Sequence, residues 1–336
     1  MAAPLAVSLG DPAGIAPEVI AESWLRREEE HLAPFFVVGG AQVLRAAANS
    51  RGIDLPIVSI FTPGEAADVF GSALPLLGGE DCTPTFGEPT IEGATLALHS
   101  LTSATALALS GEAGAVVTGP IAKSKLAEVG FTQPGQTEFL ADACSLPHEA
   151  AVMMLAGPSL RTVPLTVHEA LSAVPALVTR DLIESKARIV ARALARDFGL
   201  PSPRIAVTGL NPHAGEDGRM GTEDRDVIVP ALATLQAEGL AVTGPHPADA
   251  LFAAHARDGY DVALCMYHDQ ALIPIKTLDF DQGVNVTLGL PIVRTSPDHG
   301  TAFPIAGKGV ASPGAMIAAI RMAGECAARR TVQKAA

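Results

Sequence analysis

The chain has 336 residues, of which 48% are hydrophobic and 18% charged, a composition that supplies a large core and argues against disorder. At roughly 150 residues per domain, this length predicts two domains. The net charge of −13 argues against a general nucleic-acid binder or membrane-surface binder, because both need a basic face.

Apolar runs of strand length alternate with segments of helical period along the chain. Up to residue 143 we expect strands at 5–9, 35–38 and 115–117, a helix beginning near Pro17, a buried helix over 93–111, and a helix over 138–143 capped by Thr137. Beyond it we expect a strand pair at 152–155 and 163–167, a helix begun by a capping box of Asp181 and Glu184, and strands at 205–208 and 262–266. This alternation predicts an α/β fold with a largely parallel sheet.

Several features indicate a cytoplasmic protein. No run of about 18 consecutive apolar residues is present, and the first residues lack the basic start of a signal peptide. The four cysteines, Cys82, Cys144, Cys265 and Cys326, are far apart and form no CxxC pair. We therefore expect reduced, mostly buried thiols.

Three of the nine histidines follow predicted strands: His168, His213 and His268. Strand C-terminal ends face the ligand crevice of α/β sheets. Three imidazoles that meet there could hold a divalent metal and leave coordination positions open for a substrate. Ordinary hydrogen-bonded loop histidines are the alternative, because sequence distance does not show that the three meet.

Lys276, Asn285 and Arg294 lie in a segment, 275–294, that is rich in strand and turn residues. An ammonium group, an amide and a planar guanidinium suit a phosphate. Surface solubility is the alternative, and spacing alone favours it.

Two glycine-rich segments, 10–18 and 299–309, are of the kind that lets backbone amides approach a ligand. Each is also explained by a tight turn between a strand and a helix. No G-x-G-x-x-G follows the first strand, so the sequence does not support a Rossmann dinucleotide site.

Together these residues resemble the 4-hydroxythreonine-4-phosphate dehydrogenase family of pyridoxal phosphate biosynthesis. The resemblance covers nearly the whole chain, and its most specific stretches are GLNPHAGEDGRMGTED at 209–224, MYHDQALIPIK at 266–276 and VNVTLGLPIVRTSPDHGTA at 284–302. Segments 10–18 and 299–309 also resemble two motifs of the isocitrate and isopropylmalate dehydrogenases.

The wider resemblance implies two interwoven α/β domains of the isocitrate/isopropylmalate dehydrogenase-like type, with the active site in the interdomain cleft and at a homodimer interface. The first domain is expected to comprise 1–135 plus about 300–336 and to carry the nucleotide loops. The second, about 136–299, is expected to carry the metal residues, the substrate residues and the dimer contacts.

The family resemblance also implies a reaction on a phosphorylated small molecule. It is the metal-dependent, NAD- or NADP-linked oxidation of 4-hydroxy-L-threonine 4-phosphate at C3. The product, 2-amino-3-oxo-4-phosphooxybutanoate, decarboxylates to 3-amino-2-oxopropyl phosphate on the route to pyridoxine 5'-phosphate. One divalent ion per site is implied, Zn, Co, Mn or Mg, and three histidines favour the transition metals.

Position by position, the resemblance assigns roles to the motif residues. The metal ligands would be His168, His213 and His268, one of them supplied by the partner subunit and, by analogy, His268; Asp249 and Asp269 would orient them. The substrate would be bound by Gln136, Thr137, Lys276, Asn285 and Arg294. The dinucleotide would be bound by His299, Gly300, Thr301, Ala302 and Gly307. Lys123 is a candidate general base, because a lysine beside a metal loses its proton more readily, although a surface lysine at a helix start explains it equally well.

Three positions depart from the family pattern: Gln136 replaces the usual histidine, Ala122 an asparagine and Ala16 a glycine. A glutamine can hydrogen-bond a substrate but cannot shuttle a proton. Gln136 therefore keeps open a dehydrogenase of a related phosphorylated sugar acid, threonate or erythronate 4-phosphate. A metal- and phosphate-binding protein without redox chemistry is a further alternative, because Phe303 and Pro304 depart from the wider loop motif.

Overall fold

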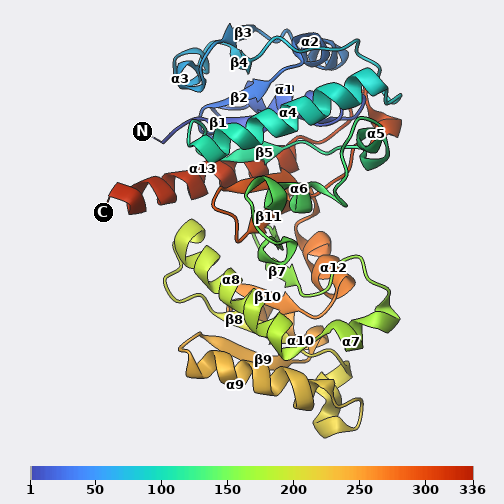
Figure 1. The fold of residues 1–336 in the computed structure, drawn as a ribbon, viewed down its shortest axis with the longest axis vertical. Coiled ribbons are helices and arrows are strands. Elements are labelled where there is room, and N and C mark those ends of the chain that lie inside the picture. Colours follow the sequence, from blue (N-terminus) through green and yellow to red (C-terminus); the bar gives the residue numbers. More distant parts are fainter. Residues whose placement is uncertain (1, 336) are drawn as a thin grey trace. The chain divides into compact units, whose positions relative to one another are not determined.

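The computed structural model describes residues 2–335, which form two compact units. Unit 1 comprises the chain up to Ala151 together with the chain from Leu290, and unit 2 is Val152–Gly289 (Figure 1). The units divide at 151/152 and 289/290, whereas the sequence led us to expect divisions at about 135/136 and 299/300. The reason is packing, because Leu140 belongs to a buried cluster of unit 1 and the strand that starts at Arg294 pairs with a strand of unit 1.

Unit 1 is built on a parallel sheet with the strand order β3-β4-β2-β1-β5-β12. Its strands are β1 (Leu5–Ser8), β2 (Phe35–Val38), β3 (Ile57–Ile60), β4 (Leu74–Leu77), β5 (Val116–Thr118) and β12 (Arg294–Pro297). The three strands predicted in this part of the chain are confirmed to within one residue. They could be found because strands covered on both faces are continuous apolar runs, as in the fully buried Phe-Phe-Val-Val of β2.

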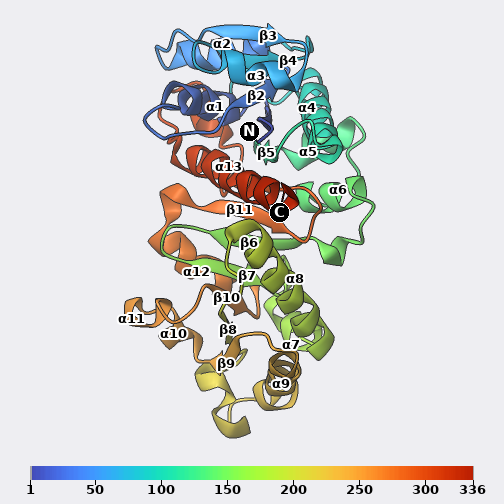
Figure 2. The same ribbon diagram turned by 90° about the vertical axis from the view of Figure 1, so that its left-hand side faces the viewer.

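Helices cover both faces of this sheet. In Figure 2, α1 (Ala16–Leu25), α2 (Ala41–Ser50) and α13 (Gly314–Ala335) lie on one face and α4 (Ile91–Ser110) on the other. The remaining helices of unit 1 are α3 (Ala66–Val69), α5 (Lys123–Glu128) and α6 (Gln136–Ala143). The predicted buried helix is confirmed as α4, which Thr90 caps by accepting a hydrogen bond from the Gly93 amide at 3.0 Å.

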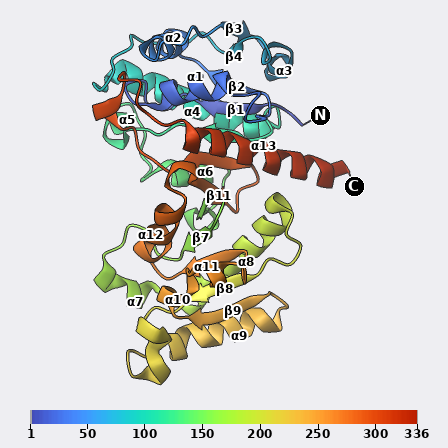
Figure 3. The same ribbon diagram turned by 180° about the vertical axis from the view of Figure 1, so that it is seen from behind.

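Unit 2 is built on a mixed sheet with the order β11-β6-β7-β10-β8-β9, in which β6 runs antiparallel to both of its neighbours. Its strands are β6 (Val152–Ala156), β7 (Arg161–Pro164), β8 (Ile205–Thr208), β9 (Val242–His246), β10 (Val262–Cys265) and β11 (Val284–Leu288). In Figure 3, α8 (Arg180–Phe198) and α9 (Val229–Ala237) cover one face and α12 (His268–Leu278) the other. Shorter helices are α7 (Val174–Leu177), α10 (Ala248–Leu251) and α11 (Ala254–Arg257).

Two predicted helix starts are wrong. The hydroxyl of Thr179 accepts a hydrogen bond from the Leu182 amide at 3.2 Å, so Thr179 caps α8 in place of a box made by Asp181 and Glu184. Helix α6 starts two residues earlier than predicted, with Gly135 at its N-cap, so Thr137 lies within the first turn and caps nothing.

Two sequence expectations about membranes and thiols can also be compared with the fold. No helix within residues 2–335 is long and apolar enough to cross a membrane. All four cysteines are free thiols, and three of them are buried, as predicted.

Candidate functional site

The first group of polar side chains in unit 1 surrounds the turn that follows β5. Arg294, at the start of β12, is only 4% exposed. Its Nε and Nη2 donate hydrogen bonds to the Thr118 hydroxyl at 3.2 and 2.8 Å, and Nη2 also donates to Oε1 of Gln136 at 2.8 Å. The amide nitrogen of Gln136 donates in turn to the Gly119 carbonyl at 3.0 Å. Both ends of the Gln136 amide are thereby fixed, with the oxygen toward the guanidinium.

Burial governs the electrostatics of this group. Loss of water lowers the pKa of Arg294 from 12.5 to about 10, although the nearby Glu138 carboxylate acts in the opposite direction. Arg294 therefore keeps its charge at neutral pH in a place where charge is costly. A buried, planar cation oriented by neutral acceptors can bind an anion through two parallel hydrogen bonds.

The second group in unit 1 joins the two glycine-rich segments. The Ile15 amide donates to the Thr301 carbonyl at 3.0 Å, and the Gly307 amide donates to the Glu18 carboxylate. A Cβ placed on Gly14 would lie 2.7 Å from the Thr301 oxygen, so only glycine allows this approach. The two segments therefore form one structure near the carboxyl ends of β1 and β12.

His299 follows β12 in this structure and is half-buried. Its Nδ1 donates to the Gly300 carbonyl at 3.0 Å, which leaves Nε2 as an acceptor. That Nε2 is buried and finds no hydrogen-bond partner among the described residues. A buried acceptor of this kind fits a ligand that brings an N–H or O–H group, as the adenosine half of a dinucleotide does.

In unit 2, the three histidines follow β7, β10 and β8, which are adjacent parallel strands. The rings of His168 and His268 lie side by side, with 5.6 Å between their centroids. Nδ1 of His268 lies 2.7 Å from a carboxylate oxygen of Asp269. This contact leaves Nε2 of His268 with a lone pair, the arrangement typical of metal-ligating histidines.

His213 is held in an unusual backbone conformation. Residues 213–217 all have positive φ, a left-handed run that costs energy for residues other than glycine. Asp224, which is 2% exposed, supports this run by accepting hydrogen bonds from the Leu210 amide at 2.9 Å and the Asn211 amide at 3.1 Å.

The imidazole donors fit a divalent transition metal in their chemistry. Within residues 2–335, however, no three His, Cys, Asp or Glu side chains gather closely enough to hold an ion. The histidines that meet within this chain are His168 and His268, whereas the analogy made His268 the partner's ligand. A complete metal site would therefore need a further ligand, from a side chain that does not lie beside His168 and His268.

The other predicted residues are dispersed. Lys276 lies in the last turn of α12, a helix, where the sequence indicated strand and turn. Asn285 lies on β11, and its Oδ1 is buried without a hydrogen-bond partner among residues 2–335. Asp249 is exposed on α10, and Lys123 is exposed as the first residue of α5.

The family of the chain follows from comparison with known proteins. The sequence profile of the family described as Pyridoxal phosphate biosynthetic protein PdxA matches residues 31–323. The chain belongs to the PdxA family. It is 64% identical over 327 residues to a 4-hydroxythreonine-4-phosphate dehydrogenase of Erythrobacter litoralis, an alignment that covers 97% of each chain. The family resemblance found in the sequence is confirmed.

Solved structures agree with this family and its fold. A 4-hydroxythreonine-4-phosphate dehydrogenase from Klebsiella pneumoniae is 38% identical, with a TM-score of 0.85 over 97% of this chain and 98% of that one. A terephthalate 1,2-cis-dihydrodiol dehydrogenase from Burkholderia xenovorans is 30% identical, with a TM-score of 0.66 over 97% and 98%. The predicted α/β fold class is confirmed, and the chain has the mixed α/β fold with a large sheet of the solved relatives.

Sequence reasoning missed three residues that organise these groups in the PdxA chain: Glu18, Thr118 and Asp224. Thr118 directly follows a predicted strand, which is a usable signal. Glu18 and Asp224 lie in segments that the sequence analysis singled out, 10–18 and 209–224, but the sequence does not show that either carboxylate is buried.

Proposed function

We propose that this protein is a cytoplasmic 4-hydroxythreonine-4-phosphate dehydrogenase that oxidises its substrate at C3 with NAD or NADP. The observation that carries the proposal is the buried guanidinium of Arg294, aligned by Thr118 and Gln136, in a PdxA chain 64% identical to a relative of that name. The substrate ends in a phosphate, and a planar buried cation suits a phosphate.

Each residue that the family resemblance assigns to the substrate has a proposed role. Arg294 and Gln136 bind the phosphate, with Thr137 and Lys276 adding donors. Asn285 offers its unpartnered Oδ1 to a hydroxyl or ammonium group of the substrate.

The divalent ion and the dinucleotide would each be bound by a set of residues named in the sequence analysis. His168, His213 and His268 would hold one divalent ion between two copies of the chain, which, when bound, makes the C3 hydroxyl more acidic. Asp269 keeps Nε2 of His268 available as a ligand by engaging Nδ1. His299, Gly300, Thr301, Ala302 and Gly307 would hold the dinucleotide that accepts the hydride. The resulting 2-amino-3-oxo acid loses CO2 readily, because its ketone delocalises the developing negative charge.

The direct test follows NADH formation with 4-hydroxy-L-threonine 4-phosphate and, separately, with D-erythronate 4-phosphate, each with and without a chelator. Turnover of the amino substrate that the chelator abolishes supports the proposal. Turnover of the sugar acid alone contradicts it.

A second function, oxidation of a phosphorylated sugar acid, is favoured by one observation. Gln136 holds the position beside Arg294 with an amide that cannot titrate, where the family pattern noted in the sequence usually has histidine. The similarity to a dihydrodiol dehydrogenase also shows that related chains are named for other substrates. A third hypothesis is a metal- and phosphate-binding protein without redox chemistry. Saturable binding of NAD would exclude this hypothesis.

A further inference from the structure

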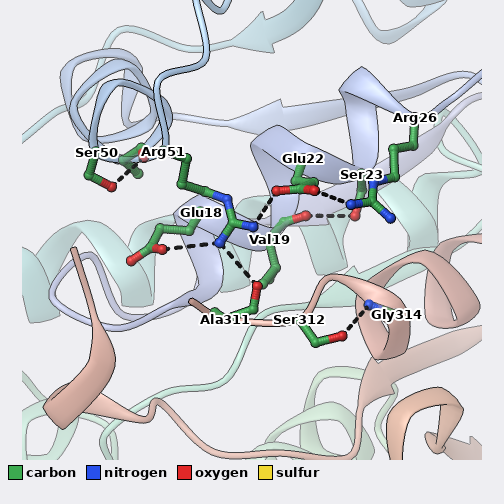
Figure 4. Close-up of polar contacts among 11 residues, drawn as sticks. Glu18, Val19, Glu22, Ser23, Arg26, Ser50, Arg51, Ala311, Ser312 and Gly314 are labelled. Carbon is green, nitrogen blue, oxygen red and sulfur yellow. Dashed lines mark hydrogen bonds and ion pairs between the residues drawn. The ribbon is translucent and has the colours of Figure 1, made fainter. Parts of the chain in front are cut away.

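Buried charges join α1, α2 and the loop 302–311 in unit 1 (Figure 4). Glu18 on α1 is fully buried, and its carboxylate accepts a hydrogen bond from the Gly307 amide while lying 3.4 Å from Nη1 of Arg51. Arg51, which follows α2, donates from the same nitrogen to the Ala311 carbonyl at 3.0 Å. Its Nη2 pairs with Glu22. We call Glu18, Glu22 and Arg51 the loop clamp.

The three charged side chains of the loop clamp depend on one another. Glu18 and Glu22 are four residues apart on α1, so their carboxylates lie on the same face and repel each other unless a cation separates them. Arg51 is that cation, with 11% of its side chain exposed. Glu22 also pairs with Arg26, so removing the Arg51 guanidinium would leave chiefly the fully buried Glu18 carboxylate without a cation.

The loop that the clamp holds has little structure of its own. It contains one short 3-10 turn, Phe303–Ile305, and positive φ angles at Ala302 (48°), Gly307 (75°) and Gly309 (68°). A left-handed alanine is unfavourable and persists only when the surroundings fix it. The clamp contacts the loop at Gly307 and at Ala311, on either side of Gly309.

We propose that Glu18 and Arg51 are positioning residues that set the affinity for the dinucleotide without touching it. They hold the 302–311 loop in the conformation that presents residues 299–307 to the coenzyme, so binding does not have to order the loop first. A loop that must be ordered on binding lowers the affinity, because the ordering cost is subtracted from the binding free energy. This inference rests on the proposed function, since it needs a dinucleotide ligand.

The test compares Glu18→Gln and Arg51→Lys with the wild type and with a matched control, Glu30→Gln. The control breaks an ion pair with Arg321 in the same unit, away from the loop. Three quantities are measured: the Kd for NAD by calorimetry without substrate, the hydrogen exchange of residues 302–311, and the urea midpoint. A fourth, the KM for NAD beside kcat, reports on turnover.

We expect Glu18→Gln to weaken NAD binding at least tenfold and to speed exchange at Gly307. We expect Arg51→Lys to do the same to a smaller degree, because a lysine keeps the charge but cannot reach Glu18, Glu22 and Ala311 together. In both variants, KM for NAD should rise by a larger factor than kcat falls. Glu30→Gln should keep the wild-type Kd.

The outcomes separate the inference from the proposed function. A wild type that binds no NAD or NADP means that the proposed function is wrong. A wild type that binds NAD, with Glu18→Gln showing the same Kd and the same exchange at Gly307, overturns the positioning role. Equal losses of NAD affinity in Glu18→Gln and Glu30→Gln, in step with their urea midpoints, overturn it as well, because the effect is then one of general stability.

Discussion

The substitution Arg294→Lys keeps the positive charge at this position but removes the planar geometry of the guanidinium. The guanidinium reaches Thr118 and Gln136 at once, from two nitrogens. A lysine has one nitrogen and cannot span the same acceptors while also facing a phosphate. The loss of one hydrogen bond to a charged group is worth about 1.5–3 kcal/mol, which lowers kcat/KM for the phosphorylated substrate roughly 10- to 150-fold at pH 7.

The substitution also makes the activity depend on pH. Burial lowers the pKa of Arg294 from 12.5 to about 10, and it lowers that of the buried Lys186 from 10.5 to about 8. The same burial should lower the pKa of the lysine in Arg294→Lys below its ordinary value. Because a base loses its charge as the pH rises through its pKa, kcat/KM of the variant should fall more steeply than that of the wild type as the pH rises from 7 to 9.

The assay is kcat/KM for 4-hydroxy-L-threonine 4-phosphate over this pH range, expressed as the ratio of variant to wild type so that the titration of the substrate cancels. Arg45→Lys, at an exposed position on α2, is the control and should match the wild type. A ratio for Arg294→Lys that stays within twofold of unity across the range would refute both the geometry and the burial argument.

Three more predictions test other parts of the chain. Gln136→His introduces a group with an ordinary pKa of about 6.5, so KM for the phosphorylated substrate should be lower at pH 5.5 than at pH 7.5, relative to wild type; parallel pH profiles would contradict this. Gly157→Ala places a Cβ 2.3 Å from Oδ2 of Asp279, which accepts hydrogen bonds from Ser159. It should lower the urea-unfolding free energy by about 1–3 kcal/mol, whereas Gly79→Ala, with no atom within 4 Å, should lower it far less. Burial lowers the folded-state pKa of Lys186 to about 8. Below pH 8 the charged ammonium therefore destabilises the folded protein, and this free-energy cost decreases as the pH rises from 8 to 10.5. The unfolding free energy of wild type relative to Lys186→Met should increase over that window by at most about 3 kcal/mol, and a constant difference would show that Lys186 is well solvated.

The strands that were predicted could be found because they are buried apolar runs, as in β2. Strands with exposed residues, such as β3 and β9, were not predicted. Helix starts were harder, since Thr179 and Asp181 both offer a capping oxygen and only the backbone geometry selects Thr179. Lys276 was placed in a segment rich in strand and turn residues, 275–294, but it lies in the last turn of α12, a helix that accommodates Pro274 in its interior.

The sequence allowed candidate site residues to be proposed one by one, but it did not allow their arrangement to be predicted. That His168 and His268 meet depends on β7 and β10 being neighbours, and strand order is not visible in a sequence. The pairing of Glu18 with Arg51 joins residues 33 positions apart, and only the packing of α1 beside α2 brings them together.

The division of the chain also has a consequence for biosynthesis. Unit 2 is one continuous stretch, whereas unit 1 lacks β12 and α13 until the last part of the chain has left the ribosome. Unit 2 of a nascent chain can therefore fold while one edge of β5 is still unpaired, because β12 has not yet been synthesised. Closing unit 1 joins segments that are far apart in sequence, the kind of long-range contact that slows folding. The hydrogen-bonded group of Arg294, Thr118 and Gln136 is then among the last parts of unit 1 to form.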